Sequence, residues 1–562
     1  MASNPMGANA LFSDTSTLDI MALRTLATLA FDTLALDTPP LEMLDSDTEY
    51  RTSAEVDLFD LENQDAARDG LPTDVISLVQ SQANAQQSFI REALLVAVLC
   101  MAQFTTQAGL GQTISSLHII GNSFDTRNPG QLSWFASAYS LTVGTFILIA
   151  GRLGDVFGHK RLLIAGFFWF ATWSLIAGFS VYSSMIFFDF CRAMQGIGPA
   201  FCLPNAIAII GRTYPPGRKQ EMLFSIFGAC APVGAIFGMT FSAIFAELLW
   251  WPWAFWAMAI FCLIIAIAAC FIIPYSPAAL HDSSVNIWIR IDALGSAFGV
   301  IGLVLVNFAW NQGPVAGWGI TYVYVLLIVG FLFLGVFGFV ESRARYPLLP
   351  SEIFNSQTGF VLACISLGWA SFGIWMYYIW LILQDLRDVS PLLACGQFAP
   401  VAISGTCAAL TTGVILSRVT PSSVMLVAMM AFCTGNILVA TMPIDQTYWA
   451  QTFLSIIITP WGMDMSFPAA TILLSNRMPQ EHQGLAASLV NTAINYSISI
   501  GLGIAGTVET QVFNGGRNRA DVLKGFHGAL YVGIGLSGMG IIVAFLFGLT
   551  ERRNAMTEKP SV

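Results

Sequence analysis

Three ionisable residues, Asp189, Arg192 and Asp464, stand in otherwise apolar stretches, where function is the default explanation for a charge. Asp189 precedes Arg192 by three residues, so the two can meet on one helix face as a proton site or as a structural ion pair. Asp464, the only carboxylate expected deep in the second half, stands between Pro460 and Pro468, which should break the helix and open its backbone to a cavity. Asp464 could bind and release a proton there, or be satisfied by backbone in a fixed kink.

A second group of residues is polar but uncharged. Gln103, Thr106 and Gln107 follow helical spacing and form one face of an apolar stretch. Such a face suits a small neutral or weakly polar solute, although the same amides could serve packing between helices. Aromatic and amide side chains of a later stretch could line the opposite wall. The candidate cavity residues are Gln103, Thr106, Gln107, Gln195, Trp375 and Tyr378, with Gln384 nearby.

The composition places these residues in a membrane protein. Hydrophobic residues make up 55% of the 562 residues and charged residues only 10%, whereas soluble domains carry about 25% charged residues. Fifteen acids and three arginines precede residue 75, so a net charge of −12 lies in this segment and +2 in the remainder. Since no basic face remains to neutralise phosphates, nucleic-acid binding is excluded as a main role.

Apolar runs long enough to cross a bilayer alternate with short polar breaks. Helices are expected, because open strands leave backbone groups unsatisfied in lipid. The fourteen predicted runs are 93–120, 131–150, 162–181, 185–211, 221–247, 252–273, 292–310, 318–340, 356–383, 390–416, 424–441, 447–473, 484–509 and 527–549.

The basic residues predict the topology. With residues 1–92 in the cytoplasm, fifteen of the Lys and Arg residues from Arg91 onward fall on the cytoplasmic side and five on the other. This positive-inside bias predicts cytoplasmic N- and C-termini. We expect a multi-pass protein of the plasma membrane, although the sequence does not separate this from an internal membrane.

An internal repeat divides the membrane part. Residues 202–215 resemble residues 466–479, at an offset of 264 residues. Parallel repeats of this kind mark the two halves of many secondary transporters. The predicted parts are an acidic, largely disordered cytoplasmic tail (1–92), a six-helix bundle (93–273), an inserted helix pair with linkers (274–355), a second six-helix bundle (356–549) and a cytoplasmic tail (550–562).

The segment 151–161 is the most specific local pattern. Its glycines allow a tight turn and close helix approach, and its basic residues should fix it at the cytoplasmic face. It could gate that face, or be a turn that only sets topology. The candidate gate residues are Gly151, Gly154, Asp155, Gly158, Lys160 and Arg161.

The sequence lacks the residue patterns of ATPases, metal sites and paired cysteines. None of the four lysines is followed by Ser or Thr, so no phosphate-binding loop of an ATPase is present. The five histidines are scattered, and the ten cysteines form no C-x-x-C pair. We therefore predict no metal, no cofactor and no enzymatic activity.

Three motifs together resemble a known family. Residues 151–161 resemble the cytoplasmic signature loop of the major facilitator superfamily, and residues 192–200 resemble its R-x-x-Q-G-x-G-x-A motif. Gly228, Pro232, Gly234 and Gly238 resemble its antiporter motif, although Ala231 replaces the usual glycine before proline. The resemblance covers roughly residues 93–550, and fourteen helices with an inserted pair point to the drug:proton antiporter subfamily.

The resemblance implies an all-α fold of two six-helix bundles and alternating access. It also implies proton antiport with export of a small compound, a role for Arg192 in proton relay, and small molecules, protons and the lipid bilayer as partners of a monomer. The first helix lacks the carboxylate common in that subfamily, which makes it similar to the fungal aminotriazole-resistance and boron-exporter group. An uncoupled facilitator and a non-transporting sensor remain alternatives.

Overall fold

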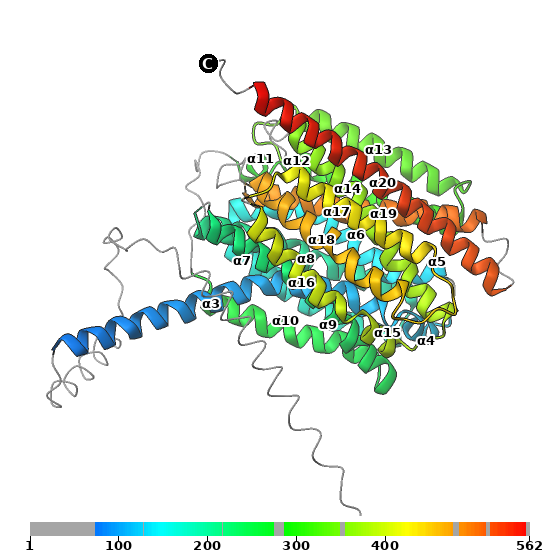
Figure 1. Cartoon of the computed structure of the whole chain (residues 1–562), viewed down its shortest axis with the longest axis horizontal. Coiled ribbons are helices and arrows are strands. Elements are labelled where there is room, and N and C mark those ends of the chain that lie inside the picture. Colours follow the sequence, from blue (N-terminus) through cyan, green and yellow to red (C-terminus); the bar gives the residue numbers. More distant parts are fainter. Residues whose placement is uncertain are drawn as a thin grey trace, which may run out of the picture. The chain divides into compact units, whose positions relative to one another are not determined.

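The computed structural model describes residues 73–126, 129–215, 217–274, 286–348, 355–416, 418–475, 483–512 and 518–557. Every regular element in these ranges is a helix (Figure 1). The chain divides into two units, Met1–Phe89 and Ile90–Val562. Residues 1–72 of the predicted disordered tail lie outside the described residues.

Fourteen helices of the described ranges are long and apolar enough to cross a membrane, which confirms the predicted fold class. Apart from short helices, they are α3 (Thr73–Ile114), α6 (Trp134–Phe157), α7 (His159–Phe179), α8 (Met185–Thr213), α9 (Arg218–Leu248), α10 (Pro252–Ile272), α12 (Ala293–Ala316), α13 (Thr321–Glu341), α14 (Ser356–Leu381) with the π-helix η3 (Ile382–Leu386), α15 (Pro391–Phe398) with α16 (Pro400–Ile415), α17 (Pro421–Ala440), α18 (Gln451–Ser475), α19 (Gln483–Val512) and α20 (Arg519–Thr557).

The first spanning helix differs from its predicted bounds. α3 begins at Thr73, well before residue 93, and its apolar span is Phe89–Ile114. It ends before two serines that separate it from α4 (Leu117–Ser123). Ser115 Oγ donates to Met239 O at 2.8 Å, and Ser116 Oγ lies 2.6 Å from Ser242 Oγ. These serine hydroxyls bond to α9, so the break also fastens α3 to its neighbour.

Two proline-containing helices are continuous. α8 contains Pro199 and Pro204, and α18 contains Pro460 and Pro468. The prediction that the prolines around Asp464 break the helix was therefore wrong. A proline removes one backbone hydrogen bond, and packing against neighbouring helices holds the remaining turns together.

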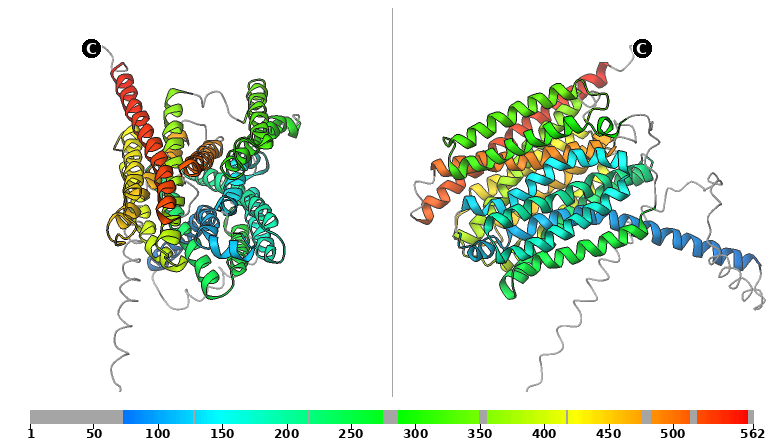
Figure 2. Two further views of the ribbon diagram at one scale, coloured as in Figure 1. Left: turned by 90° about the vertical axis from the view of Figure 1, so that its right-hand side faces the viewer. Right: turned by 180° about the vertical axis from the view of Figure 1, so that it is seen from behind.

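The spanning helices form two groups, which Figure 2 shows on different sides of its left-hand view. In the N-terminal group α8 packs on α6 and α7, and α7 packs on α10. In the C-terminal group α17 packs on α18 and α20, while α14 packs on α19 and α20. The groups meet where α19 contacts α6 and where α16 contacts α9.

A helix pair joins these groups from the side. α12 packs on α13, α19 and α6. Its indoles bond to α19: Trp310 Nε1 donates to Ile500 O at 2.9 Å, and Trp318 Nε1 donates to Thr507 Oγ1 at 2.9 Å. The more exposed α13 has only Val323 and Gly330 buried. α12 is thus the member of the pair that packs on both helix groups.

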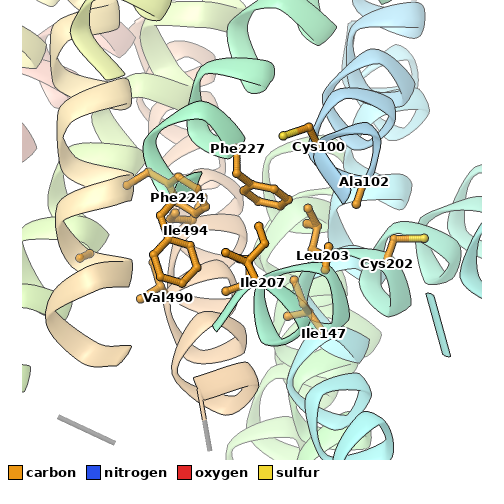
Figure 3. Packing of buried hydrophobic residues seen from close by; sticks show 14 of the residues in the cluster. Cys100, Ala102, Ile147, Cys202, Leu203, Ile207, Phe224, Phe227, Val490 and Ile494 are labelled. Atoms are coloured by element: carbon orange, nitrogen blue, oxygen red, sulfur yellow. The ribbon is translucent and has the colours of Figure 1, made fainter. Parts of the chain in front are cut away.

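Apolar side chains join the two groups near one end of the helices. Figure 3 shows Phe224 of α9 and Ile207 of α8 beside Val490 and Ile494 of α19. This end also carries Arg152, Lys160 and Arg212 and is called the basic end below; the other is the opposite end. Burial of such side chains favours contact between the groups at the basic end.

Candidate functional site

The segment 151–161 is mostly helical, contrary to the predicted loop. α6 continues to Phe157 and α7 starts at His159. Only Gly158 separates them, with a φ of 95° that glycine adopts without steric cost. The turn is therefore a single residue, and Gly151, Gly154 and Asp155 lie on the last turns of α6.

Asp155 joins three helices of the N-terminal group. Its Oδ1 accepts a hydrogen bond from Arg212 Nη2 of α8 at 2.9 Å and lies 3.3 Å from His159 Nε2 of α7. His159 Nδ1 lies 2.7 Å from Asn205 Oδ1. A side chain on Gly154 would collide with His159 and Asn205, so this glycine allows the cluster to form.

The basic residues of the segment reach neighbouring elements. Lys160 Nζ donates to Cys270 O at 2.9 Å and also to Ile273 O. The buried Arg152 donates from Nε to Arg290 O at 3.0 Å. Arg161 is exposed. Hydrogen bonds from the segment thus connect α7 to the C-terminal end of α10 and α6 to the residues just before the inserted pair.

Arg192 is fully buried inside the N-terminal group. Its Nε donates to Phe135 O at 2.8 Å, and its Nη2 donates to Gly109 O at 2.8 Å. Its Nη1 donates to Gln195 Oε1, and its guanidinium lies 4.6 Å from the centre of the Tyr139 ring. A planar guanidinium suits several fixed acceptors at once. Arg192 therefore ties α8 to α3 and α6.

Asp189 does not pair with Arg192, and Gln195 does not face any of the described cavities. No ion pair joins Asp189 to Arg192, both of which are described, and Asp189 Oδ1 is buried without a described hydrogen-bond partner. Gln195 Nε2 donates to Ser174 Oγ at 2.6 Å. The fully buried Gln195 therefore lies in the interior of the N-terminal group, and its place in a substrate cavity stays a prediction.

The residues of the antiporter motif pack on two sides of α9. A Cβ on Gly238 would lie 2.5 Å from Ala108 Cα of α3, and one on Gly234 would overlap the Phe104 backbone. On the side of the C-terminal group, a Cβ on Gly228 would lie 3.1 Å from Pro468. The motif thus lets α9 approach α3 and α18 closely.

Asp464 lies where three helices of both groups meet. The carboxylate is 3% exposed, and its Oδ2 has no hydrogen-bond partner among the described residues. A Cβ on Gly405 of α16 would collide with Asp464 Oδ2 and lie 2.7 Å from Pro232 Cγ of α9. The structure therefore brings a residue of the antiporter motif next to the junction that holds Asp464.

The predicted polar face of the first helix is mostly buried. Thr106 Oγ1 donates to Ala102 O at 2.6 Å within α3, and Gln103 Oε1 has no partner among the described residues. Gln107 is partly exposed. Trp375 Nε1 donates to Ser455 Oγ at 2.6 Å, which places the indole inside the C-terminal group. Trp375 and these α3 residues are absent from the linings of the described cavities, unlike Tyr378.

A cavity of about 350 Å³ lies near the opposite end, between α6, α12, α14 and α19. Tyr378 lines it together with Glu509, and Tyr378 Oη donates to Glu509 Oε2 at 2.6 Å. Glu509 is a second carboxylate of the C-terminal half, where the sequence predicts Asp464 as the only deep one. The available signal was that Glu509 is the last residue of the predicted run 484–509.

Polar contacts also join the two groups at the opposite end. His118 Nε2 of α4 lies 3.0 Å from Asp385 Oδ1, and Gln384 Nε2 donates to Ser115 O at 3.2 Å. Asp385 and Gln384 belong to η3, and π-turns inside helices are frequent at functional sites. The groups therefore touch at both ends, with Asp464 between them.

Comparisons with known proteins agree with this architecture. The model of the Major Facilitator Superfamily matches residues 93–503. A low affinity ammonium transporter of Saccharomyces cerevisiae is 63% identical over 471 residues, covering 84% of this chain and 91% of that protein. The efflux pump terJ of Aspergillus terreus is 51% identical, covering 84% and 91%. The aminotriazole resistance protein of S. cerevisiae is 39% identical, covering 81% and 84%.

Solved structures share the fold. The human organic anion transporter MFSD10 superposes with a TM-score of 0.57 at 14% identity, over 81% of this chain and 99% of that one. The family match and the relatives, together with the fourteen spans and the three motifs, give one conclusion: the chain belongs to the Major Facilitator Superfamily of membrane transporters.

Proposed function

We propose that this protein exports a small compound by proton antiport, with the two helix groups alternating between access from either side. The observation that carries the proposal is Asp464, a buried carboxylate where α9, α16 and α18 meet; its Oδ2 has no hydrogen-bond partner in the described part of the chain. Intramembrane carboxylates mark proton pathways in transporters. The expected plasma-membrane location, with both termini in the cytoplasm, belongs to the same proposal.

The position of Asp464 suits coupling. A proton that binds there changes the charge at the contact between the two groups, and both Gly405 and Pro232 lie beside it. Protonation can therefore favour one packing of α9 against α16 over another. A ligand shifts such an equilibrium only through different interactions in the two states, which a junction between moving groups provides.

Arg192 has a different part in this proposal. Its described donors go to backbone carbonyls and to an amide and a hydroxyl, so the guanidinium holds α3, α6 and α8 in register. We assign it a positioning role and leave proton binding to Asp464. Asp189, whose Oδ1 is buried without a described hydrogen-bond partner, remains a second candidate for proton binding.

The names of the relatives support a small solute. Among them are proteins named for efflux, for aminotriazole resistance and for ammonium transport. Aminotriazole and ammonium are both small nitrogen compounds. They are therefore suitable first probes, together with boric acid as a small neutral solute.

The test uses the full chain in sealed vesicles with an acidic lumen, because an antiporter then concentrates its substrate inside. Uptake of labelled aminotriazole, methylammonium and boric acid is measured for the wild type, Asp464→Asn and Asp388→Asn. Asp388 is a surface carboxylate paired with Arg519 and serves as the matched control. Exchange of labelled for unlabelled substrate without a gradient shows whether each variant remains folded.

We expect Asp464→Asn to keep exchange but lose gradient-driven accumulation, while Asp388→Asn behaves as the wild type. Gradient-driven accumulation by Asp464→Asn at the wild-type level would overturn the role of this carboxylate. Wild-type flux that ignores the gradient would identify an uncoupled facilitator, consistent with the first helix lacking a carboxylate. No flux of any probe would favour a sensor.

A further inference from the structure

The cavity near the opposite end has the features of a solute site. Its volume of about 350 Å³ falls near the lower end of the usual range for ligand pockets. Its walls come from both helix groups and from the inserted helix α12, and they include Ser137, Asn311, Tyr377, Tyr378, Glu509 and Thr510. A solute in this cavity would therefore contact both helix groups and α12 at once.

Among the described residues that line the cavity, Glu509 is the only ionisable acid or base apart from the phenols of Tyr377 and Tyr378. Tyr378 Oη bonds to Glu509 Oε2, and no described Lys, Arg or His forms an ion pair with this carboxylate. Among the described residues, the cavity lining therefore carries one carboxylate with no cation paired to it.

We propose that this cavity binds a small protonated amine, with Glu509 as its counter-ion. The carboxylate accepts N–H hydrogen bonds, which are stronger when both groups are charged. The aromatic rings of Tyr377 and Tyr378 in the wall favour a cation further. This charged solute differs from the neutral or weakly polar solute expected from the glutamine face of the first helix.

The bond from Tyr378 also explains how the carboxylate is aimed. The phenol is buried and packs edge-on against Tyr377, with ring centres 5.3 Å apart. The phenol of Tyr378 donates to Oε2 of Glu509, so the other carboxylate oxygen is left to accept hydrogen bonds from a solute in the cavity. An anion would be repelled by this arrangement, and a neutral solute would leave the charge of Glu509 unbalanced.

The inference deepens the proposed function, but its test does not depend on proton coupling. Binding of labelled methylammonium, which is protonated at neutral pH, is measured on the purified full chain in detergent. The variants are Glu509→Gln, Glu509→Asp, Tyr378→Phe and the control Asp388→Asn. Acetamide, a small neutral compound, is added as competitor, and elution as a single species shows that each variant is folded.

We expect Glu509→Gln to weaken binding about tenfold or more, the order associated with losing a hydrogen bond between charged groups. Glu509→Asp should retain more binding than Glu509→Gln, Tyr378→Phe should weaken it less, and acetamide should not compete. Binding that is unchanged in Glu509→Gln, or absent from the wild type, would overturn the inference. Either result leaves gradient-driven transport of aminotriazole intact as a test of the proposed function.

Discussion

The carboxylate of Asp464 in α18 lies directly against the backbone of Gly405 in α16, leaving no space for a methyl group. Pro232 of α9 closes the third side of this contact, so a buried acid, a glycine and the proline of the antiporter motif converge from both helix groups. Movement of α9 relative to α16 must therefore change the surroundings of Asp464.

Replacing Gly405 by alanine should reduce transport strongly. The added Cβ would meet Asp464 and lie 2.7 Å from Pro232, and overpacking of a tight contact costs about 1–3 kcal/mol. The matched control is Gly396→Ala in α15, where a Cβ meets nothing within 4 Å. Substrate uptake in vesicles is the measurement. Wild-type uptake by Gly405→Ala would show that this contact is not part of the transport cycle.

Replacing Gly234 by leucine should abolish transport while membrane insertion continues. A Cβ there overlaps the backbone of Phe104, so α9 could no longer approach α3. Gly335→Leu in α13 is the control, because its Cβ position is open. Surface expression and uptake are compared for both variants. Unchanged uptake by Gly234→Leu would refute the close-packing role of this glycine.

Replacing Arg192 by lysine should lower thermal stability although the charge is kept. A lysine cannot reproduce the forked donors that reach Phe135 O and Gly109 O, and each buried acceptor left without a donor costs about 1–3 kcal/mol. The exposed Arg519→Lys provides the control. Apparent melting temperatures in detergent decide the matter: equal values for the two variants would contradict the positioning role.

The spanning helices could be predicted from the sequence because hydrocarbon imposes a length and an apolar composition on each of them. The charged residues of the motifs were equally visible, since charges in apolar runs are rare. The hydrogen-bond partners of these residues could not be predicted from the sequence. Asp189 and Arg192 have the right spacing to pair, yet the guanidinium reaches carbonyls of Phe135 and Gly109 on other helices instead.

Two features that differ from the sequence-based predictions, the continuity of α18 and the place of Glu509, have the same cause. The prolines near Asp464 were expected to break α18, but contacts with neighbouring helices keep it continuous. Glu509 was overlooked because it ends its apolar run, and only the packing of α14 and α19 brings Tyr378 to it. Tertiary contacts between distant segments decide such features, and a single sequence does not contain them explicitly.

The effects of Asp155 and Arg212 on stability should be coupled more strongly than those of a similar ion pair at the surface. Asp155 is 7% exposed and Arg212 25% exposed, whereas Asp388 and Arg519 are 71% and 63% exposed. Exposed pairs contribute about 0–1 kcal/mol because water screens them, while a buried partner left alone keeps an uncompensated charge.

A double-mutant cycle tests this coupling with Asp155→Asn, Arg212→Gln and both together, and with Asp388→Asn, Arg519→Gln and both together. For the Asp155 pair, the double variant should melt at a clearly higher temperature than the sum of the single shifts predicts, because removing either partner already costs the interaction. For the surface pair the shifts should add. Additive shifts at Asp155 and Arg212 would mean that these side chains stabilise the basic end independently, and the cluster around Gly154 would then not act as a unit.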